Sequence, residues 1–316
     1  MTPFEPSLKR SPYQLSREVA NAKGNNLPLV ALESTVVTHG LPKPENLALA
    51  RAMEAVVRGV GAVPATIALM DGKVKVGLTE TELERLAKAE NPRKVSLLDF
   101  GVVLAGGEIG GTTVAATMFV AEKQGIQVFA TGGIGGVHRG NPTDISTDLM
   151  QLGRCPVLVV CAGAKAILDL PATMEYLETQ GVPVIGFQTD ELPAFYATSS
   201  GIKLKARVET PKEAAKITEA HWGMGLKSGI LLVVPPPKDA AIERSLVEGW
   251  IEKALLQANV EGIRGNAITP YLLDRVSHLS EGRSKRTNIA LLKNNARVAA
   301  EVAASLASGF ESTRYI

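Results

Sequence analysis

The feature of the sequence that most constrains the fold is a set of five short apolar runs rich in Val, Ile and Leu. Apolar residues follow one another in these runs instead of alternating with polar ones, a pattern typical of strands buried on both faces of a sheet. Each run stops at Gly, Thr, Ser or Pro, which marks the end of a strand. The runs occupy residues 27–35, 125–133, 155–163, 181–189 and 228–237.

Segments with the helical spacing of apolar residues lie between several of these strands. The predicted helices at 44–61, 112–125 and 164–181 each close on Gly. Pro171 is expected to kink the third of them. Strands that alternate with helices predict an α/β layered fold with a largely parallel or mixed sheet.

One stretch breaks the alternation. Residues 61–79 are predicted to form a hairpin with Asp71 and Gly72 in its turn. The chain then becomes mainly helical in its last third. The remaining predicted helices occupy residues 79–91, 240–262, 269–282 and 287–309.

The 316 residues would allow two domains, but no change of composition marks a second one, even at the Pro-rich segment 233–239. We therefore expect one domain over 28–309, preceded by a polar arm at 1–27 and followed by a short tail at 310–316. An organellar transit signal in the arm is an alternative, against which its acidic residues argue.

Charge and cysteine content exclude several classes of protein. Lys and Arg number 34 and Asp and Glu 32, a net charge of +2, which indicates neither a nucleic-acid groove nor binding to an anionic membrane. A small anionic ligand remains compatible with this balance. No apolar stretch approaches the length of about 18 residues that a transmembrane helix needs. Cys155 and Cys161 fit neither a CxxC motif nor a disulfide framework, so the expected location is the reducing cytoplasm.

Polar residues that follow the strands form the candidate site, because ligands bind beyond the carboxyl ends of strands in open α/β sheets. Glu33 lies inside the first apolar run, where burial would raise its pKa and suit it to act as a general acid. A glutamate paired with Lys or Arg, or one that faces solvent, is the alternative. His39 is expected to be a hydrogen-bonded structural residue.

Two Gly-rich segments extend the candidate site. In 104–118, Thr112 and Thr113 are possible helix N-caps at a turn that could bind an anion through free N–H groups, or that could serve packing alone. In 130–149 the spacing of the glycines is wrong for a dinucleotide-binding site.

The second of these segments also carries groups that bind metals. His138, Asp144 and Asp148 could supply imidazole and oxygen ligands to a divalent ion. The alternative is that the two aspartates cap a turn and a helix.

Lysine and asparagine complete the set of candidates. Lys165 follows a buried strand, where a neutral amine could attack a carbonyl carbon and form a Schiff base, or it extends from the first turn of a helix into solvent. Lys94 is expected to be solvated unless the fold brings it to the anion site. Asn288 and Asn295 lie on the last predicted helix, where Asn usually lies at the surface or caps an end.

Taken together, the segments resemble one family, the pseudouridine-5'-phosphate glycosidases, also called pseudouridylate synthases and related to protein A of indigoidine gene clusters. The resemblance covers residues 28–308 and rests on eight motifs in order: ALEST at 31–35, GAVPATIAL at 61–69, TTVAATM at 112–118, ATGGIGGVHRG at 130–140, DISTDL at 144–149, VVCAGAK at 159–165, LETQGVPVIGFQT at 177–189 and LPAF at 192–195.

The resemblance implies a single three-layer α/β/α sandwich, a homotrimer and one divalent ion per subunit, usually Mn²⁺. It also implies reversible cleavage of the C–C glycosidic bond of pseudouridine 5'-phosphate to uracil and ribose 5-phosphate, through a lysine Schiff base with the ring-opened ribose. Matched residue by residue, Glu33 corresponds to the proton donor, Lys165 to the nucleophile and Asp144 to the metal ligand. The substrate-binding positions correspond to Lys94, Val114, His138, Ser146, Thr147, Asp148 and Asn288.

Two departures from the family pattern bear on specificity. The loop between His138 and Asp144 is shorter than the usual form, and residues 198–286 are only loosely similar. Two other functions compete with the one that the resemblance implies. One is a different Schiff-base enzyme, an aldolase or lyase acting on another sugar phosphate, and the other is a non-catalytic nucleotide-binding protein. The presence of both Glu33 and Lys165 favours catalysis, since binding alone requires neither.

Overall fold

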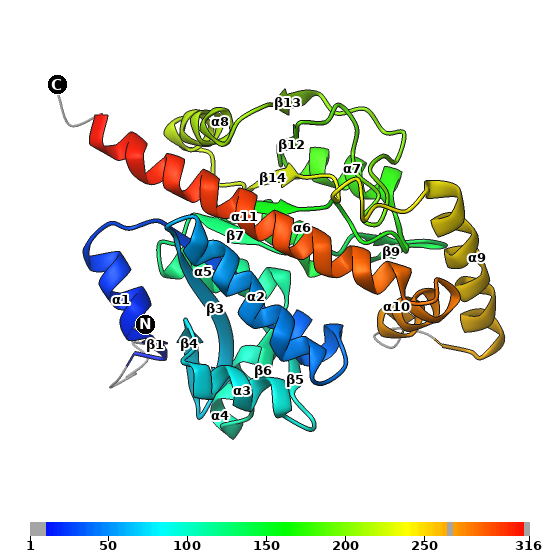
Figure 1. Cartoon of the computed structure of the whole chain (residues 1–316), viewed down its shortest axis with the longest axis horizontal. Coiled ribbons are helices and arrows are strands. Elements are labelled where there is room, and N and C mark those ends of the chain that lie inside the picture. Colours follow the sequence, from blue (N-terminus) through cyan, green and yellow to red (C-terminus); the bar gives the residue numbers. More distant parts are fainter. Residues whose placement is uncertain (1–10, 264–267, 313–316) are drawn as a thin grey trace, which may run out of the picture.

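The five apolar runs form the centre of one parallel sheet. A computed structural model describes residues 11–263 and 268–312 of the chain (Figure 1). The five strands are neighbours and run parallel, as the uninterrupted apolar pattern predicted. In spatial order they are β2 (Leu29–Leu32), β7 (Val128–Ala130), β10 (Leu158–Cys161), β14 (Ile230–Val233) and β12 (Val184–Phe187).

Shorter strands extend the sheet on both sides and make it mixed. β3 (Val63–Met70) pairs in parallel with β2 and antiparallel with β4 (Lys73–Val76), so the predicted hairpin is confirmed. Both turn residues, Asp71 and Gly72, have positive φ angles of 53° and 69°, as a tight hairpin turn requires. The other strands of this sheet are β1 (Tyr13–Leu15), β5 (Arg93–Val95), β6 (Gly110–Thr112) and β13 (Ala206–Val208).

Helices cover both faces of the sheet and complete the predicted three-layer sandwich. On one face, α11 (Arg283–Ser312) packs against α2 (Glu45–Gly59), α8 (Pro211–Gly223) and the central strands (Figure 1). On the other face, α5, α6 and α7 pack in sequence, with α5 against β2 and β7. Their bounds are α5 (Val114–Lys123), α6 (Thr147–Leu152) and α7 (Leu170–Thr179).

The remaining helices lie at the periphery. α9 and α10 pack against each other at one end of the molecule (Figure 1). The peripheral elements are α1 (Arg17–Gly24), a π-helix η1 (Val36–Gly40), α3 (Glu80–Lys88), a 3₁₀ turn η2 (Leu97–Asp99), α4 (Phe100–Gly106), α9 (Arg244–Val260) and α10 (Ile268–Leu279). A separate antiparallel sheet in the order β11-β8-β9 contains β8 (Val137–His138), β9 (Asn141–Ile145) and β11 (Leu168–Asp169).

Pro171 starts a helix instead of kinking one, contrary to the prediction. It occupies the first turn of α7, where its missing N–H costs no hydrogen bond, and Asp169 caps the helix by accepting from Ala172 N at 3.0 Å. The stretch from 164 to 167, predicted to be helical, is a loop.

The packed structure begins before residue 28, where the domain was expected to start. β1 pairs with β4, and the buried Lys75 amine of β4 donates to Gln14 Oε1 of β1 at 2.8 Å. In α1, Val19 is fully buried. At the other end of the chain, α11 continues to Ser312, past the expected start of the tail at 310, and residues 313–316 lie outside the described part.

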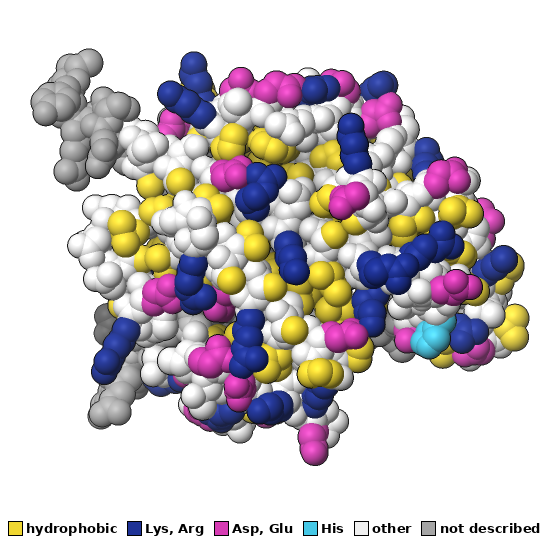
Figure 2. Space-filling model, in the orientation of Figure 1, with side chains coloured by type: hydrophobic (Ala, Val, Ile, Leu, Met, Phe, Trp, Pro, Cys, Tyr) yellow, Lys and Arg dark blue, Asp and Glu magenta, His cyan; other side chains and the backbone are white. Residues whose placement is uncertain are grey.

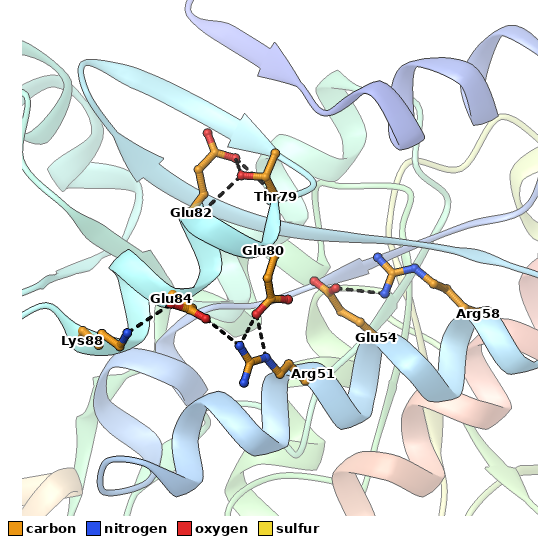
Figure 3. A network of polar contacts seen from close by, with 8 residues as sticks. All are labelled: Arg51, Glu54, Arg58, Thr79, Glu80, Glu82, Glu84 and Lys88. Carbon is orange, nitrogen blue, oxygen red and sulfur yellow. Dashed lines mark hydrogen bonds and ion pairs between the residues drawn. The ribbon is translucent and has the colours of Figure 1, made fainter.

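Ion pairs join α2 to its neighbours on the surface. Figure 3 shows Arg51 of α2 reaching Glu80 and Glu84 of α3, the second at 2.8 Å.

Lys and Arg side chains are interspersed with Asp and Glu on the face drawn in Figure 2, in keeping with the near-neutral total charge. None of the helices in 11–263 and 268–312 is long and apolar enough to cross a membrane.

Candidate active site at the carboxyl edge of the sheet

The candidate site lies where the order of the strands reverses. From β2 the chain passes through α2 to β3 on one side, whereas α5 leads into β7 on the other side. Such a reversal opens a crevice between the carboxyl ends of the two middle strands. Glu33 follows β2 directly and Thr131 follows β7 directly, so both residues lie at this crevice.

Glu33 is the acid at this position. Its side chain is half-buried, and Glu33 Oε1 accepts a hydrogen bond from the Thr131 hydroxyl. Burial raises the pKa of Glu33, in the direction predicted, and the negative charge of Asp148 adds to the effect. The positive charges of Lys165 and Lys94 and the Thr131 hydrogen bond act in the opposite direction. A glutamate with a raised pKa can hold a proton near neutral pH and donate it.

Lys165 reaches the same edge from β10. It lies in the loop between β10 and β11, so the predicted alternative of a lysine on the first turn of a helix is wrong. Its backbone N–H donates to Ile134 O at 3.1 Å, which ties this loop to the Gly-rich loop after β7. The half-buried side chain is close enough to Glu33 and Lys94 for its charge to influence both pKa values.

Lys94 is brought to the site by β5 and β6, a pair of strands that the sequence pattern did not reveal. Lys94 is paired in register with Gly111 of β6. A Cβ atom at Gly111 would collide with the Thr38 side chain and with Ser34 O, so β6 lies directly against the segment that follows Glu33. The surrounding protein and the charge of Lys165 lower the pKa of Lys94, although its side chain is exposed. The fold thus brings Lys94 beside the Gly-rich segment 104–118 and within electrostatic reach of Lys165.

Asp148 fastens the loops of the site together. Its side chain is 5 % exposed, with Oδ1 accepting from Ala115 N at 2.9 Å and Oδ2 from Gly135 N at 2.8 Å. Thr113 is the N-cap of α5, whereas Thr112, the other predicted cap, belongs to β6. Asp148 and Thr113 thus take up N–H groups in the first turn of α5, where the sequence predicted free donors for an anion.

The other predicted binding residues surround this arrangement. Val114 is buried in the first turn of α5, and Ser146 caps α6 by accepting from Asp148 N at 3.3 Å. The Thr147 hydroxyl lies 3.1 Å from that of Ser96, which follows β5. Asn288 of α11 lies beside Gly132, where an added Cβ would come within 3.4 Å of Asn288 Oδ1.

The metal-binding arrangement of His138, Asp144 and Asp148 is not formed. His138 and Asp144 lie on the β8–β9 hairpin, while both carboxylate oxygens of Asp148 are occupied by backbone N–H groups. Within 11–263 and 268–312, no group of three or more His, Cys, Asp or Glu side chains is placed to hold a metal ion. Asp144 remains as one half-buried carboxylate at the hairpin.

Two residues of the site, Arg139 and Phe195, were missed at the sequence level, and Asn295 was expected in the wrong environment. Arg139 donates to carbonyl oxygens of the segment after Lys165. Phe195, whose own φ is 60°, packs its ring against Gly133. Asn295 donates to Thr131 O at 2.8 Å. Arg139 and Phe195 stand inside motifs quoted above, so their presence was visible but their contacts were not. Asn295, expected at the surface or at a cap, is fully buried.

A hollow of about 620 Å³ lies elsewhere, beyond the ends of β12 and β14. Neither Glu33 nor Lys165 lines it. Two of its cations are already paired, Lys203 with Glu191 at 2.9 Å and Arg207 with Asp190 at 2.7 Å. The candidate residues Glu33 and Lys165 are therefore outside this hollow.

Comparison with known proteins gives a consistent result over nearly the whole chain. The family model of indigoidine synthase A like protein matches residues 18–305. Pseudouridine-5'-phosphate glycosidases from Caldanaerobacter subterraneus and Geobacillus kaustophilus are 54% and 52% identical to the chain. Each alignment covers 92% of this chain, and 96% and 97% of the respective relative.

Solved structures share the fold. The prealnumycin C-glycosynthase AlnA, in complex with ribulose 5-phosphate, superposes with a TM-score of 0.89 at 42% identity, covering 95% of this chain and 98% of AlnA. An indigoidine synthase A-like protein from Thermotoga maritima gives a TM-score of 0.86 at 34% identity, covering 96% of this chain and 100% of the other. The chain therefore belongs to the family of indigoidine synthase A-like proteins.

Proposed function

We propose that this protein is a pseudouridine-5'-phosphate glycosidase, an enzyme that reversibly cleaves the C–C glycosidic bond of pseudouridine 5'-phosphate to uracil and ribose 5-phosphate. The observation that carries the proposal is the meeting of Glu33, Lys165 and Lys94 at one crevice. An acid, an amine nucleophile and a cation for phosphate are the groups that this reaction needs. The names of relatives about half identical to the chain support the same reaction.

Cleavage of this C–C bond is assisted when the uracil carbon accepts a proton and the sugar carbon carries a nitrogen whose lone pair can form a double bond to it. The ribose ring opens as the C1'–O4' bond breaks and O4' takes up a proton, and the Lys165 amine gives up a proton as its Nζ becomes bonded to C1'. Glu33 gives its proton to C5 of uracil, the C1'–C5 bond breaks, and the nitrogen lone pair forms the C1'=N double bond of the Schiff base. Water then hydrolyses the Schiff base, which releases ribose 5-phosphate and restores the lysine.

The remaining site residues would bind and orient the substrate. Lys94 supplies positive charge to the phosphate, and Asp148 keeps the loops around the crevice in fixed positions. Orientation of this kind contributes a large part of the rate of such reactions. Val114, His138, Ser146, Thr147 and Asn288 complete the proposed binding residues.

A divalent ion, Mn²⁺ by the family resemblance, would be held by Asp144. Small divalent ions often bind through one or two carboxylates and keep several waters, so a lone half-buried carboxylate fits such a site. When bound, the ion supplies fixed positive charge for the substrate. Dialysis against a chelator should lower activity, and Mn²⁺ should restore it to the normal chain but not to Asp144→Asn.

We further infer a cytoplasmic homotrimer. The trimer rests on the family resemblance, and the location rests on two buried free thiols of the kind that a reducing compartment preserves. Light scattering of the purified protein tests the trimer.

Two substrates test the reaction. Incubation with Mn²⁺ should release uracil from pseudouridine 5'-phosphate and not from uridine 5'-phosphate. Failure to release uracil from the C-nucleotide would contradict the proposal and favour another Schiff-base enzyme.

Borohydride reduction with ribose 5-phosphate should leave a sugar adduct on Lys165 that mass spectrometry detects and that Lys165→Ala lacks. A chain that forms no adduct would favour a non-catalytic binding protein.

A further inference from the structure

We propose that Thr131 is a positioning residue that fixes which oxygen of Glu33 carries the transferred proton, and that Asn295 holds Thr131 in place. The proposal rests on the function proposed above, in which Glu33 protonates the uracil carbon. Neither residue is among the catalytic or binding positions that the family resemblance supplied.

Thr131 is in direct contact with Glu33. Thr131 is fully buried at the end of β7, and its hydroxyl donates to Glu33 Oε1. Its backbone N–H donates to Val160 O of β10 at 3.0 Å, so the strand pairing fixes the residue from one side. Thr131 therefore links the strand that precedes the lysine loop to the side chain of the acid.

This hydrogen bond makes the two oxygens of the Glu33 carboxyl group unequal. A neutral carboxyl group has one O–H, and the oxygen without hydrogen is the better acceptor. A hydroxyl that donates to Oε1 makes Oε1 the acceptor and leaves the acidic proton on Oε2. The proton to be transferred thus has a defined position before the substrate arrives, which is what orientation in catalysis requires.

Asn295 of α11 holds the backbone of Thr131. Asn295 is fully buried, and its Nδ2 donates to Thr131 O at 2.8 Å and to Gly132 O at 3.5 Å. Within the described residues Asn295 Oδ1 is buried without a hydrogen-bond partner, an arrangement that costs stability. An apolar residue would avoid that cost but would leave Thr131 O without this donor. One turn earlier on the helix, Leu292 packs beside Gly132, within 3.2 Å of an added Cβ.

The charged groups around Glu33 are the same with and without the hydroxyl. Lys165 and Lys94 favour the ionised carboxylate, whereas Asp148 and burial favour the neutral acid. Because none of these groups is altered by Thr131→Val, a change in the titration of Glu33 reports the hydrogen bond alone. Removing a donor to the carboxylate raises the pKa of the acid further.

The experiment compares Thr131→Val, which keeps the shape, with Thr131→Ser, which keeps the hydroxyl. Thr131→Val should lower kcat for uracil release roughly tenfold or more, a part of the roughly 100-fold or larger contribution of a general acid. It should leave KM near normal and move the alkaline limb of the pH profile to higher pH. Thr131→Ser should stay close to the unmodified chain. Asn295→Leu should lower kcat in the same way, whereas Asn294→Ala on the same helix should not.

A second measurement does not depend on turnover. Infrared difference spectra of the normal chain minus Glu33→Gln give the titration of the Glu33 carboxyl, and the same subtraction in the Thr131→Val background should show it at higher pH. An unchanged titration in a chain that releases uracil would overturn the role of Thr131 and leave the function intact. No uracil release from the unmodified chain would overturn the proposed function itself. Matching circular dichroism spectra and melting temperatures verify that the variants fold.

Discussion

At the scale of single residues, the site depends on an acid whose charge state differs between the folded and unfolded protein. Burial raises the pKa of Glu33, so the folded chain binds a proton at pH values where the unfolded chain has released it. The contribution of this group to stability is present at low pH and is lost as pH rises through the usual carboxyl pKa toward the raised one.

Glu33→Gln removes this loss because glutamine resembles the neutral acid. At pH 8 the variant should have the larger free energy of unfolding, by about 1.4 kcal/mol for each unit by which the pKa is raised. At pH 4 the two chains should unfold alike in urea. Uracil release should fall by roughly 100-fold or more, the contribution of a general acid. A variant that is less stable than the normal chain at pH 8 would contradict this account of Glu33.

The two cysteines should be inert while the protein is folded. Burial raises the pKa of both the Cys155 and the Cys161 thiol to about 12, and only the thiolate is a good nucleophile. A chromogenic disulfide reagent should therefore react with neither thiol in buffer at pH 8 and with both in denaturant. Rapid reaction of the folded chain with retained activity would show that one thiol is accessible.

At the scale of the element, the loop that carries Lys165 is held by Arg139. The guanidinium donates to Ala166 O at 2.9 Å and to Leu168 O at 3.1 Å, and it forms two hydrogen bonds with Glu248 of α9. Both side chains of the ion pair are about one-quarter exposed, so water screens the pair only in part.

Arg139→Gln should lower the free energy of unfolding by about 1–3 kcal/mol, because the hydrogen bonds of a charged group are lost. It should also slow formation of the borohydride-trapped adduct, since the lysine loop loses its support. Arg139→Lys should recover little of this stability, because lysine lacks the planar guanidinium of arginine that donates several hydrogen bonds at once. Arg297→Gln, which breaks a pair within α11 whose arginine is exposed and whose Glu301 is half-buried, is the control and should cost under about 0.5 kcal/mol. Equal losses in the two variants would argue against a special role for Arg139.

The length and apolar character of each strand decide which parts of the site could be predicted from the sequence. Glu33 and Lys165 follow strongly apolar strands, and the carboxyl ends of parallel strands share one edge, so their meeting was predictable. Lys94 depends on strands of three residues each, too short for a periodic signal. Asn295 binds a carbonyl 164 positions away, and no local pattern encodes such a contact. A proline is compatible with a kink inside a helix and with the first turn of a helix. The predicted helix began at 164, so Pro171 fell in its interior, whereas α7 begins at Leu170 and places Pro171 in its first turn.

At the scale of the whole molecule, the segment before residue 28 is part of the packed structure. Arg58 of α2 forms two hydrogen bonds of 2.9 Å with Glu18 of α1, and it also pairs with the buried Glu54 (Figure 3 shows the pair with Glu54). The sequence predicted an arm because this segment is polar, yet its apolar residue Val19 is fully covered.

A chain that begins at residue 28 should therefore be less stable than the whole chain. Loss of the buried Val19 side chain alone is worth about 1.5–3 kcal/mol, and the pairing of β1 with β4 is lost with it. Thermal unfolding of the two chains measures the difference, and Glu18→Gln, which removes only a partly exposed ion pair, serves as the milder comparison. An unchanged melting temperature in the shortened chain would contradict the packing described for α1.

Because α11 is the last helix of the chain, the site can be completed only at the end of synthesis. Synthesis proceeds from the amino end, so the strands that carry Glu33 and Lys165 emerge long before Asn288 and Asn295. Until that last helix packs across β7, the loop after Thr131 lacks its support. A nascent chain that ends before Arg283 would hold Glu33 and Lys165, the two proposed reacting residues, and should still be inactive. Activity should therefore appear only after the whole polypeptide has left the ribosome.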